Sequence, residues 1–384
     1  MPYIFTVIAV VCAVLALGGT AYFAMAIWAA KRFLAETKLP IDAGFAPPVS
    51  ILKSLKGLDP HMYAAFRTHC VLDYPEYEVL FGVQDPADPA VALVEQLQAE
   101  FPQRSLRLIH CPDVLGLNGK VSNLAQMLPQ ARYERVLIND SDIVVPPDYL
   151  SRVLAPFARQ DVGMVTTLYR GLPGRTLGSR LESLGLSSDF TGGVLIARQL
   201  EGGIRFALGA TVATTKSVLR EIGGLEPLAD YLGDDYELGA RTAAAGRKIE
   251  LAQTIVETAL PDYSFGEFWR HQMRWARNVK DRRPLQYLGL IVTFGLPWSI
   301  FALLLQSRSW WTWLVFAVTA ATRFAAAQIV ARNVLRDASF EKNARLLPLR
   351  DFVALAIWIA SFFGNTVEWR GLRFRLRQGK LEKL

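Results

Sequence analysis

The chain has 384 residues, a formal net charge of +7, and 52% hydrophobic residues. This apolar content exceeds that of an ordinary soluble domain and is concentrated toward the two ends, which indicates a membrane protein. Much of the positive charge lies beside the apolar segments, so we expect no nucleic-acid partner. Cys12, Cys70 and Cys111 form no paired framework, so the globular part is expected to face a reducing compartment.

The first apolar segment covers residues 3–28 and is followed by Lys31 and Arg32. It is long enough to cross a bilayer and lacks a clear cleavage site, so we interpret residues 1–32 as an N-terminal transmembrane anchor rather than a signal peptide. Positive charges gather on the cytoplasmic side of a membrane, so Lys31 and Arg32 predict that the following domain is cytoplasmic.

Residues 45–265 have an ordinary globular composition, in which strands alternate with helices. Strands are expected at 49–53, 77–83, 106–109 and 136–139, and helices at 60–70, 89–100 and 118–128. This alternation predicts an α/β fold with a doubly wound, mostly parallel, Rossmann-like sheet. Such sheets bind their ligands at the carboxyl ends of the strands.

The strand at 136–139 leads directly into Asp140-Ser141-Asp142. Carboxylates at positions i and i+2 of a strand end can hold one Mg²⁺ or Mn²⁺, which usually shares such ligands with substrate phosphates. The alternative is an ordinary turn. The functional interpretation is a metal site at Asp140 and Asp142 in an enzyme that uses nucleotide-sugars.

Asp85 and Asp88 follow the strand at 77–83. Their carboxylates can accept hydrogen bonds from a base or a ribose. The alternative for Asp88 is a helix cap, which suits its place before Pro89.

Asp234 and Asp235 precede a helix expected at 238–245. Asp234 is expected to cap that helix, while Asp235 points into the cleft. A carboxylate near an acceptor can serve as a general base that takes a proton from a hydroxyl.

Aromatic residues alternate with arginines at 268–277, just before the second apolar segment. We interpret residues 266–284 as an interfacial amphipathic helix. Arg274 can in addition neutralise a diphosphate, because guanidinium matches phosphate geometry, and Trp275 can form a wall for the acceptor.

Residues 285–384 contain the remaining membrane segments and a basic tail. Stretches 285–305 and 310–330 are expected to form a hairpin across the membrane. The stretch 352–367 is about 16 residues, or roughly 24 Å as a helix, which is too short to span. We therefore expect it to be re-entrant or interfacial, with the basic tail on the cytoplasmic side.

Five of these residues, in chain order, resemble the D, D, D, (Q/R)-x-x-R-W series of membrane-bound family 2-like glycosyltransferases: Asp88, Asp140, Asp235 and the pair Arg274-Trp275. Segments 49–60, 72–80 and 83–90 more specifically resemble the ceramide glucosyltransferase family. His271 stands where the series has Gln or Arg, which puts that one role in doubt; Gln272 is the other candidate.

The resemblance implies a GT-A type nucleotide-sugar domain on transmembrane helices and an inverting transfer to a lipid hydroxyl. It implies that Asp140 and Asp142 hold the diphosphate through Mg²⁺ or Mn²⁺. The implied catalytic residues are Asp235, Arg274, Trp275 and His271, and the implied donor-binding residues are Asp85, Asp88, Lys120 and Asp140. For Lys120, a solvated surface lysine is the alternative.

The expected partners are a UDP-sugar donor, a membrane lipid acceptor and the bilayer. The 271–277 motif and the ending at 369–375 resemble a bacterial branch of hopanoid biosynthesis, thought to add N-acetylglucosamine to bacteriohopanetetrol. This implies a multi-pass protein of a bacterial inner membrane. The alternative is a ceramide glucosyltransferase. Two further alternatives are a processive polysaccharide synthase, for which the membrane segments are few, and a non-catalytic binding protein.

Overall fold

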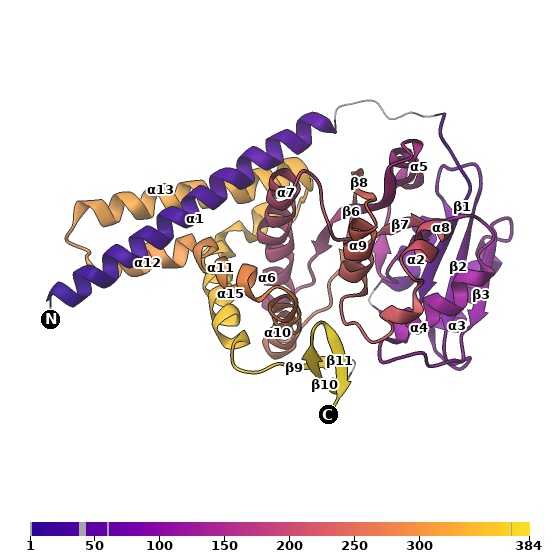
Figure 1. Cartoon of the computed structure of the whole chain (residues 1–384). Helices are drawn as coiled ribbons and strands as arrows, with labels where there is room; N and C mark the ends of the chain where they lie inside the picture. The colour runs from indigo at the N-terminus through magenta and orange to yellow at the C-terminus, as the bar shows by residue number, and fades with distance from the viewer. Residues whose placement is uncertain (1, 38–43, 60, 370) are drawn as a thin grey trace.

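The computed structural model describes residues 2–37, 44–59, 61–369 and 371–384. Its described part contains an eight-stranded mixed sheet with the order β3-β2-β1-β4-β7-β6-β8-β5 (Figure 1). The strands are β1 (Val49–Ser54), β2 (Tyr77–Val83), β3 (Leu106–His110), β4 (Arg135–Ile138), β5 (Ile143–Val144), β6 (Val162–Leu172), β7 (Val212–Thr215) and β8 (Lys248–Ala259).

The predicted α/β fold is confirmed, and the four strands expected from the sequence form one parallel half, β3-β2-β1-β4. The other half is mixed: β7 runs antiparallel to both β4 and β6, and β5 antiparallel to β8. Successive residues of β1, Ile51 and Leu52, point to opposite faces and are both fully buried. Burial on both faces explains why β1 contains successive apolar residues in the sequence.

Short helices cover the two faces of the sheet. Their bounds are α2 (Met62–Cys70), α3 (Ala90–Glu100), α4 (Gly119–Met127) with η1 (Leu128–Gln130), α5 (Tyr149–Leu154) with η2 (Ala155–Ala158), α8 (Lys216–Glu221), η4 (Glu226–Leu228) and α9 (Asp234–Ala244). Residue 60 of the predicted helix, residue 1 of the predicted anchor and residue 370 of the basic tail lie outside the described residues.

A second group of helices contains the apolar segments. Within the described residues, two helices are long and apolar enough to cross a membrane, Tyr3–Glu36 within α1 (Pro2–Glu36) and Trp310–Val334, which joins α13 (Trp310–Gln328) to η6 (Ile329–Val334). A third candidate span consists of two helical pieces joined at a bend of 52°. The first piece is α11 (Pro284–Gly289) with η5 (Leu290–Thr293), and the second is α12 (Gly295–Leu305).

The helices α1 and α12 approach each other at two glycines. A Cβ atom on Gly19 would lie 2.4 Å from the Cα atom of Gly295, so no side chain fits there. Small residues commonly allow such close packing of helices in membranes.

An insertion between β6 and β7 connects the sheet to these helices. It consists of α6 (Leu177–Gly185), the π-helical turn η3 (Leu186–Phe190) and α7 (Thr191–Leu200), and Figure 1 shows α6 and α7 between the sheet and α1. Gly193 of α7 lies against the hydroxyl of Tyr22 in α1. The sequence analysis did not anticipate this insertion.

The C-terminal region differs from its prediction. After α10 (Phe265–Arg282) and the membrane segments come α14 (Phe340–Asn343), η7 (Ala344–Leu346) and α15 (Leu347–Ser361). The expected apolar segment 352–367 is therefore wrong in extent, because the helix ends at Ser361. The basic tail forms a three-stranded sheet of β9 (Thr366–Trp369), β10 (Leu372–Arg377) and β11 (Lys380–Lys383).

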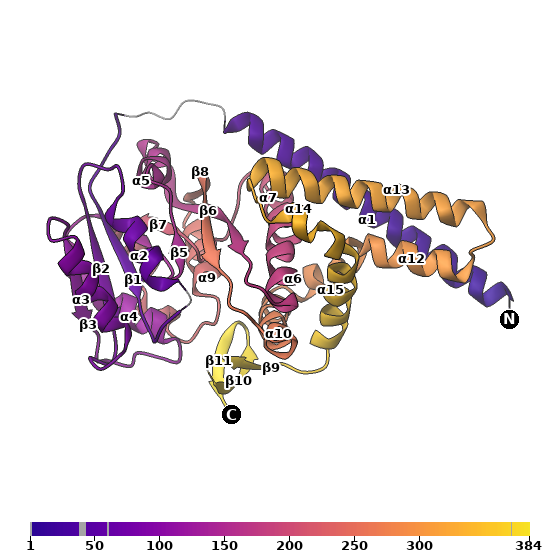
Figure 2. The ribbon, with the colours of Figure 1, turned by 180° about the vertical axis from the view of Figure 1, so that it is seen from behind.

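This C-terminal sheet packs against the globular domain. Leu232 N donates a hydrogen bond to Gly379 O at 3.1 Å, and Leu381 N donates to Asp230 O at 2.8 Å. Seen from behind, the three strands lie beside α10 and apart from α1 and α13 (Figure 2). The basic tail therefore lies beside the domain that contains the acidic residues.

Candidate active site

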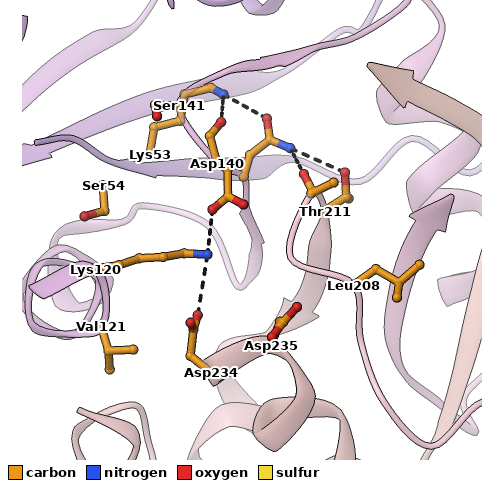
Figure 3. Close-up of polar contacts among 12 residues, drawn as sticks. Lys53, Ser54, Lys120, Val121, Asp140, Ser141, Leu208, Thr211, Asp234 and Asp235 are labelled. Atoms are coloured by element: carbon orange, nitrogen blue, oxygen red, sulfur yellow. Dashed lines mark hydrogen bonds and ion pairs between the residues drawn. The ribbon is translucent and has the colours of Figure 1, made fainter. Parts of the chain in front are cut away.

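Lys120 joins two acidic segments that are far apart in the sequence. Its Nζ atom lies 2.6 Å from Asp140 Oδ1 and 3.5 Å from Asp234 Oδ2 (Figure 3). Lys120 is the second residue of α4, where the side chain of Asn118 caps the helix by accepting from the N–H groups of Lys120 and Val121. Burial alone would lower the pKa of Lys120, but Asp140 and Asp234 outweigh it and raise that pKa. The interpretation of Lys120 as a solvated surface lysine is therefore wrong.

Asp235 lies next to this cluster, in the first turn of α9. Burial and the charge of Asp234 raise its pKa to about 6. A Cβ atom on Gly209 would lie 3.0 Å from Asp235 Oδ2 and 3.5 Å from Asp140 Oδ2. The bare backbone of Gly209 thus lies beside both carboxylates, and the structure brings Asp140 and Asp235 close together.

The prediction that Asp234 caps the following helix is wrong. The helix begins at Asp234 itself, its N-cap residue is Gly233, and no side chain caps it. Asp234 instead accepts a hydrogen bond from Asn118 Nδ2 at 3.3 Å and pairs with Lys120. The pairing with the partly buried ammonium of Lys120 gives Asp234 a role distinct from that of the adjacent Asp235.

Asp142 is the more enclosed member of the predicted metal pair. Burial, followed by the charge of Asp140, raises its pKa to about 6. Its Oδ2 atom accepts a hydrogen bond from the hydroxyl of Thr258, and Ser141 Oγ donates to Asp59 Oδ2 at 2.5 Å. Neighbouring residues therefore fix the whole Asp140-Ser141-Asp142 step.

A buried network that the sequence analysis did not assign supports this step from behind. Lys53 in β1 is fully buried, and its Nζ atom donates to Asn139 Oδ1 and to Asp140 O, both at 2.9 Å. His69 Nε2 lies 2.6 Å from the same Asn139 oxygen. Burial lowers the pKa of Lys53 to about 7, although Asp142 and Asp140 oppose that shift. The feature of the sequence that could have identified Lys53 is its position inside a buried strand, where a lysine is rarely found without a partner.

Asp88 adopts the capping role given as its alternative. Its Oδ1 atom accepts from Ala90 N at 2.9 Å, at the start of α3, and both oxygens accept from Gly57 N, at 3.0 and 2.8 Å. Asp88 also lines a surface groove, whose other lining residues include Lys56, Gln84, Asp85, Gly119 and Asn123. The groove therefore runs from the two predicted nucleoside-binding aspartates to the start of α4, which carries Lys120.

The three predicted residues of α10 form a second cluster with Glu182 of α6. Trp275 Nε1 donates to His271 Nε2 at 3.3 Å, and His271 Nδ1 lies 3.0 Å from Glu182 Oε1, an ion pair when the imidazole is protonated. The rings of Tyr263 and His271 stack with their centroids 5.7 Å apart. The charge of Arg274 acts on the same tyrosine, which places that guanidinium beside the cluster. Glu182, 5% exposed, was not identified from the sequence.

Tyr169 of β6 connects the two clusters. Burial raises its pKa first, and the charges of Asp235, Asp140, Glu182 and Asp142 raise it further, in that order. Both groups of carboxylates thus lie within electrostatic range of one buried phenol. The structure brings the predicted residues at positions 140, 235 and 120 together, with Asp142 two residues from Asp140, whereas the predicted residues of α10 belong to the separate cluster with Glu182.

Comparison with known proteins gives the class of this protein, a glycosyltransferase. The sequence profile described as glycosyl transferase family 21 matches residues 11–382, and the chain belongs to this family. The family identification confirms the predicted UDP-sugar-dependent glycosyltransferase and the resemblance to ceramide glucosyltransferases.

Two curated relatives are similar over most of their length. Ceramide glucosyltransferase 1 of Caenorhabditis elegans is 23% identical, with 87% of this chain and 72% of the relative covered. A ceramide glucosyltransferase of Komagataella phaffii is 25% identical, with 90% and 85% covered.

A solved structure matches the fold of nearly the whole chain. It is the mannosyltransferase PcManGT from Pyrobaculum calidifontis in complex with GDP-Man and Mn²⁺, with a TM-score of 0.56 and 18% identity, covering 94% of this chain and 99% of that one. This likeness confirms the predicted GT-A fold with membrane helices.

Proposed function

We propose that this protein transfers a hexose from a UDP-sugar to the hydroxyl of ceramide or a closely related lipid, with inversion at the anomeric carbon. The membership in family 21 and the two ceramide glucosyltransferase relatives support this acceptor class. The observation that carries the proposal is the position of Asp140 and Asp235, whose carboxylates both lie beside Gly209, with Lys120 paired to Asp140. The proposed base, Asp235, thus lies beside the proposed diphosphate site at Asp140 and Lys120.

The donor is proposed to lie along the groove from Asp88 to Lys120. Asp85 and Asp88 would receive the nucleoside, and Lys120 and Arg274 would balance the charge of the diphosphate, which grows as UDP leaves. Positioned cations of this kind stabilise the transition state more than the ground state.

A divalent cation, Mg²⁺ or Mn²⁺, is part of the proposal. The donor set fits such an ion, because Asp140 and Asp142 offer carboxylate oxygens two positions apart, and Mg²⁺ binds through one or two carboxylates plus substrate phosphates. When bound, the ion would polarise the phosphoryl oxygens and neutralise the leaving group.

Asp235 is proposed as the general base. Its carboxylate takes the proton from the lipid hydroxyl while that oxygen bonds to the anomeric carbon, and the bond from this carbon to the UDP oxygen breaks. Burial raises the pKa of Asp235 to about 6, which brings it closer to neutral pH and makes the carboxylate a better proton acceptor. His271 and Trp275 are proposed to line the acceptor side.

The hopanoid acceptor and the N-acetylglucosamine donor expected from the sequence find no support in the relatives. Both relatives described above are named ceramide glucosyltransferases, which favours the alternative. A bacterial inner-membrane location with several passes and a cytoplasmic catalytic domain stays a proposal, supported by the apolar helices and by Lys31 and Arg32.

Product analysis tests the proposal. Purified full-length protein is incubated with UDP-glucose or UDP-N-acetylglucosamine, together with ceramide or bacteriohopanetetrol, and the lipids are analysed by mass spectrometry. We expect a single hexose on ceramide, and none with Asp235→Asn. Transfer only to bacteriohopanetetrol would refute the acceptor, and a polymer would indicate a processive synthase.

A further inference from the structure

The C-terminal sheet has one face turned toward the protein and one turned toward solvent. In β10, Phe374 and Leu376 are buried, whereas Arg373, Arg375 and Arg377 between and beside them are exposed. This alternation is the period of two that a strand imposes on its side chains. Trp369 and Leu372 are directly opposite each other at the β9–β10 turn.

The inward face packs against the start of α4. Val367, Phe374, Leu376 and Leu381 form a small buried cluster, against which Leu117, Leu232 and Trp369 pack. Leu117 stands two residues before Gly119, the first residue of α4. The sheet therefore lies directly beside the segment that presents Lys120.

The loop that holds the sheet also holds the active site. The segment 229–232 accepts from Asn118 N at Ala229 O (2.6 Å) and from Asn118 Nδ2 at Tyr231 O (2.8 Å). On its other side, Tyr231 bridges to Lys380 of β11. The same segment leads into Asp234 and Asp235, so the position of the sheet relative to the catalytic residues is fixed by backbone hydrogen bonds.

The groove that contains Asp88 continues onto this sheet. A second hollow, lined by Lys56, Leu117, Gly119, Trp369, Leu372 and Phe374, shares Lys56 and Gly119 with the groove lined by Asp85 and Asp88. Its lining combines the ammonium of Lys56 on the side of the domain with apolar side chains from Leu117 and from the C-terminal sheet. A nucleoside has both characters, with polar edges and flat apolar faces.

We propose that the C-terminal sheet forms the outer wall of the donor groove and that Trp369 and Leu372 contact the nucleoside of the UDP-sugar. The inference rests on the proposed function and assigns a binding role to a segment about 130 residues beyond Asp235 in the chain. An indole beside a nucleobase supplies stacking that depends little on the identity of the base. The sheet therefore adds affinity, while Asp85 and Asp88 remain the groups able to hydrogen-bond the nucleoside.

Binding to a membrane surface explains the sheet less well. Two of its outward arginines lie opposite acidic residues, Arg373 opposite Glu368 and Arg375 opposite Glu382, which reduces the net charge of that face. The sheet also lies apart from the spanning helices α1 and α13 in both views (Figures 1 and 2).

Calorimetry with the full-length protein in detergent tests the inference, with UDP and pyrophosphate as separate ligands. We expect Trp369→Ala to weaken UDP binding by about tenfold, the lower part of the range for base–aromatic stacking, and to leave pyrophosphate binding unchanged. Trp369→Phe should restore most of the affinity. Leu372→Ala, at a side chain that is 59% exposed and so removable without unfolding, should weaken UDP binding by about threefold. The matched control is Arg375→Ala on the outward face, which should bind UDP as the wild type does.

Three results overturn the inference. Wild-type affinity for UDP in both Trp369→Ala and Leu372→Ala would show that the sheet does not contact the nucleoside. An equal loss of UDP and pyrophosphate binding would show that the sheet only braces Lys120. A wild-type protein that binds no UDP at all would refute the proposed donor, and the inference would fail with it.

Discussion

Replacement of Asp235 by Asn separates the proposed catalytic role of this residue from its effect on stability. The amide keeps the size of the carboxylate but cannot take a proton from the acceptor hydroxyl. A general base typically contributes 10²–10⁴-fold to the rate, so we expect kcat to fall by about that factor. UDP binding should change little, because the groove lined by Asp85 and Asp88 is untouched.

The same substitution should stabilise the protein at neutral pH. The pKa of Asp235 rises from 3.8 to about 6 on folding, so the folded protein binds its proton more tightly than the unfolded chain does. The free energy of unfolding therefore falls as the pH rises from about 4 to about 6, by up to ~3 kcal/mol at 1.36 kcal/mol per unit of pKa. Because Asp235 is only partly buried by surface area, water screens its charge, and we expect about 1–2 kcal/mol.

Two measurements check this reasoning on one variant. Thermal unfolding in detergent should give Asp235→Asn a Tm a few degrees above that of the wild type at pH 8, with the difference vanishing near pH 4. The wild-type transfer rate should decline below about pH 6, as the base becomes protonated. Near-wild-type transfer by Asp235→Asn would refute the catalytic assignment, and a lower Tm than wild type at pH 8 would refute the argument from the buried charge.

Three further substitutions probe the surroundings of the base. The double substitution Asp140→Ala and Asp142→Ala should abolish the effect of Mg²⁺ or Mn²⁺ on UDP binding in calorimetry; an undiminished effect would refute the metal site. Gly209→Ala should lower kcat by about tenfold with little change in Tm, since its methyl group would lie 3.0 Å from Asp235 Oδ2 and force that carboxylate to shift; Gly289→Ala, where a Cβ meets nothing, is the control, and equal activity of the two variants would contradict the geometry. Glu182→Gln should lower kcat by about tenfold without weakening UDP binding, as measured by kinetics and calorimetry; wild-type kcat would show that the α10 cluster is structural.

The fold could be predicted from the sequence where local patterns and burial agree. The strands at 49–53, 77–83, 106–109 and 136–139 are rich in apolar residues, most of them buried, and all were found within two residues of their ends. The second half of the sheet gave no such signal, because β7 and β5 are short and depend on neighbours distant in the chain. The tail strands were missed because their arginines suggested a membrane-side charge cluster.

The aspartates of the site could be predicted because each follows a structural element whose end the sequence marks. Asp140 and Asp142 follow the strand β4, and Asp235 lies in the first turn of α9. The capping role of Asp88 was likewise predictable from Pro89, since the geometry is local. For Asp234, local rules failed: its partner is Lys120, more than one hundred residues away, and the ion pair takes the place of the expected cap.

Three residues that shape the site have no local signature at all. Lys53 supports Asp140 from inside a strand, Glu182 approaches the imidazole of α10 from an inserted helix, and Gly209 makes room for two carboxylates. Each is defined by what lies across the fold from it. A buried charge is costly unless it is paired, so a lysine or glutamate within an apolar pattern indicates a partner elsewhere, even when the sequence does not identify that partner. Lys53 has its partners at Asn139 and Asp140, and Glu182 has its partner at His271 of α10. Such unexplained charges are therefore useful pointers to a candidate active site.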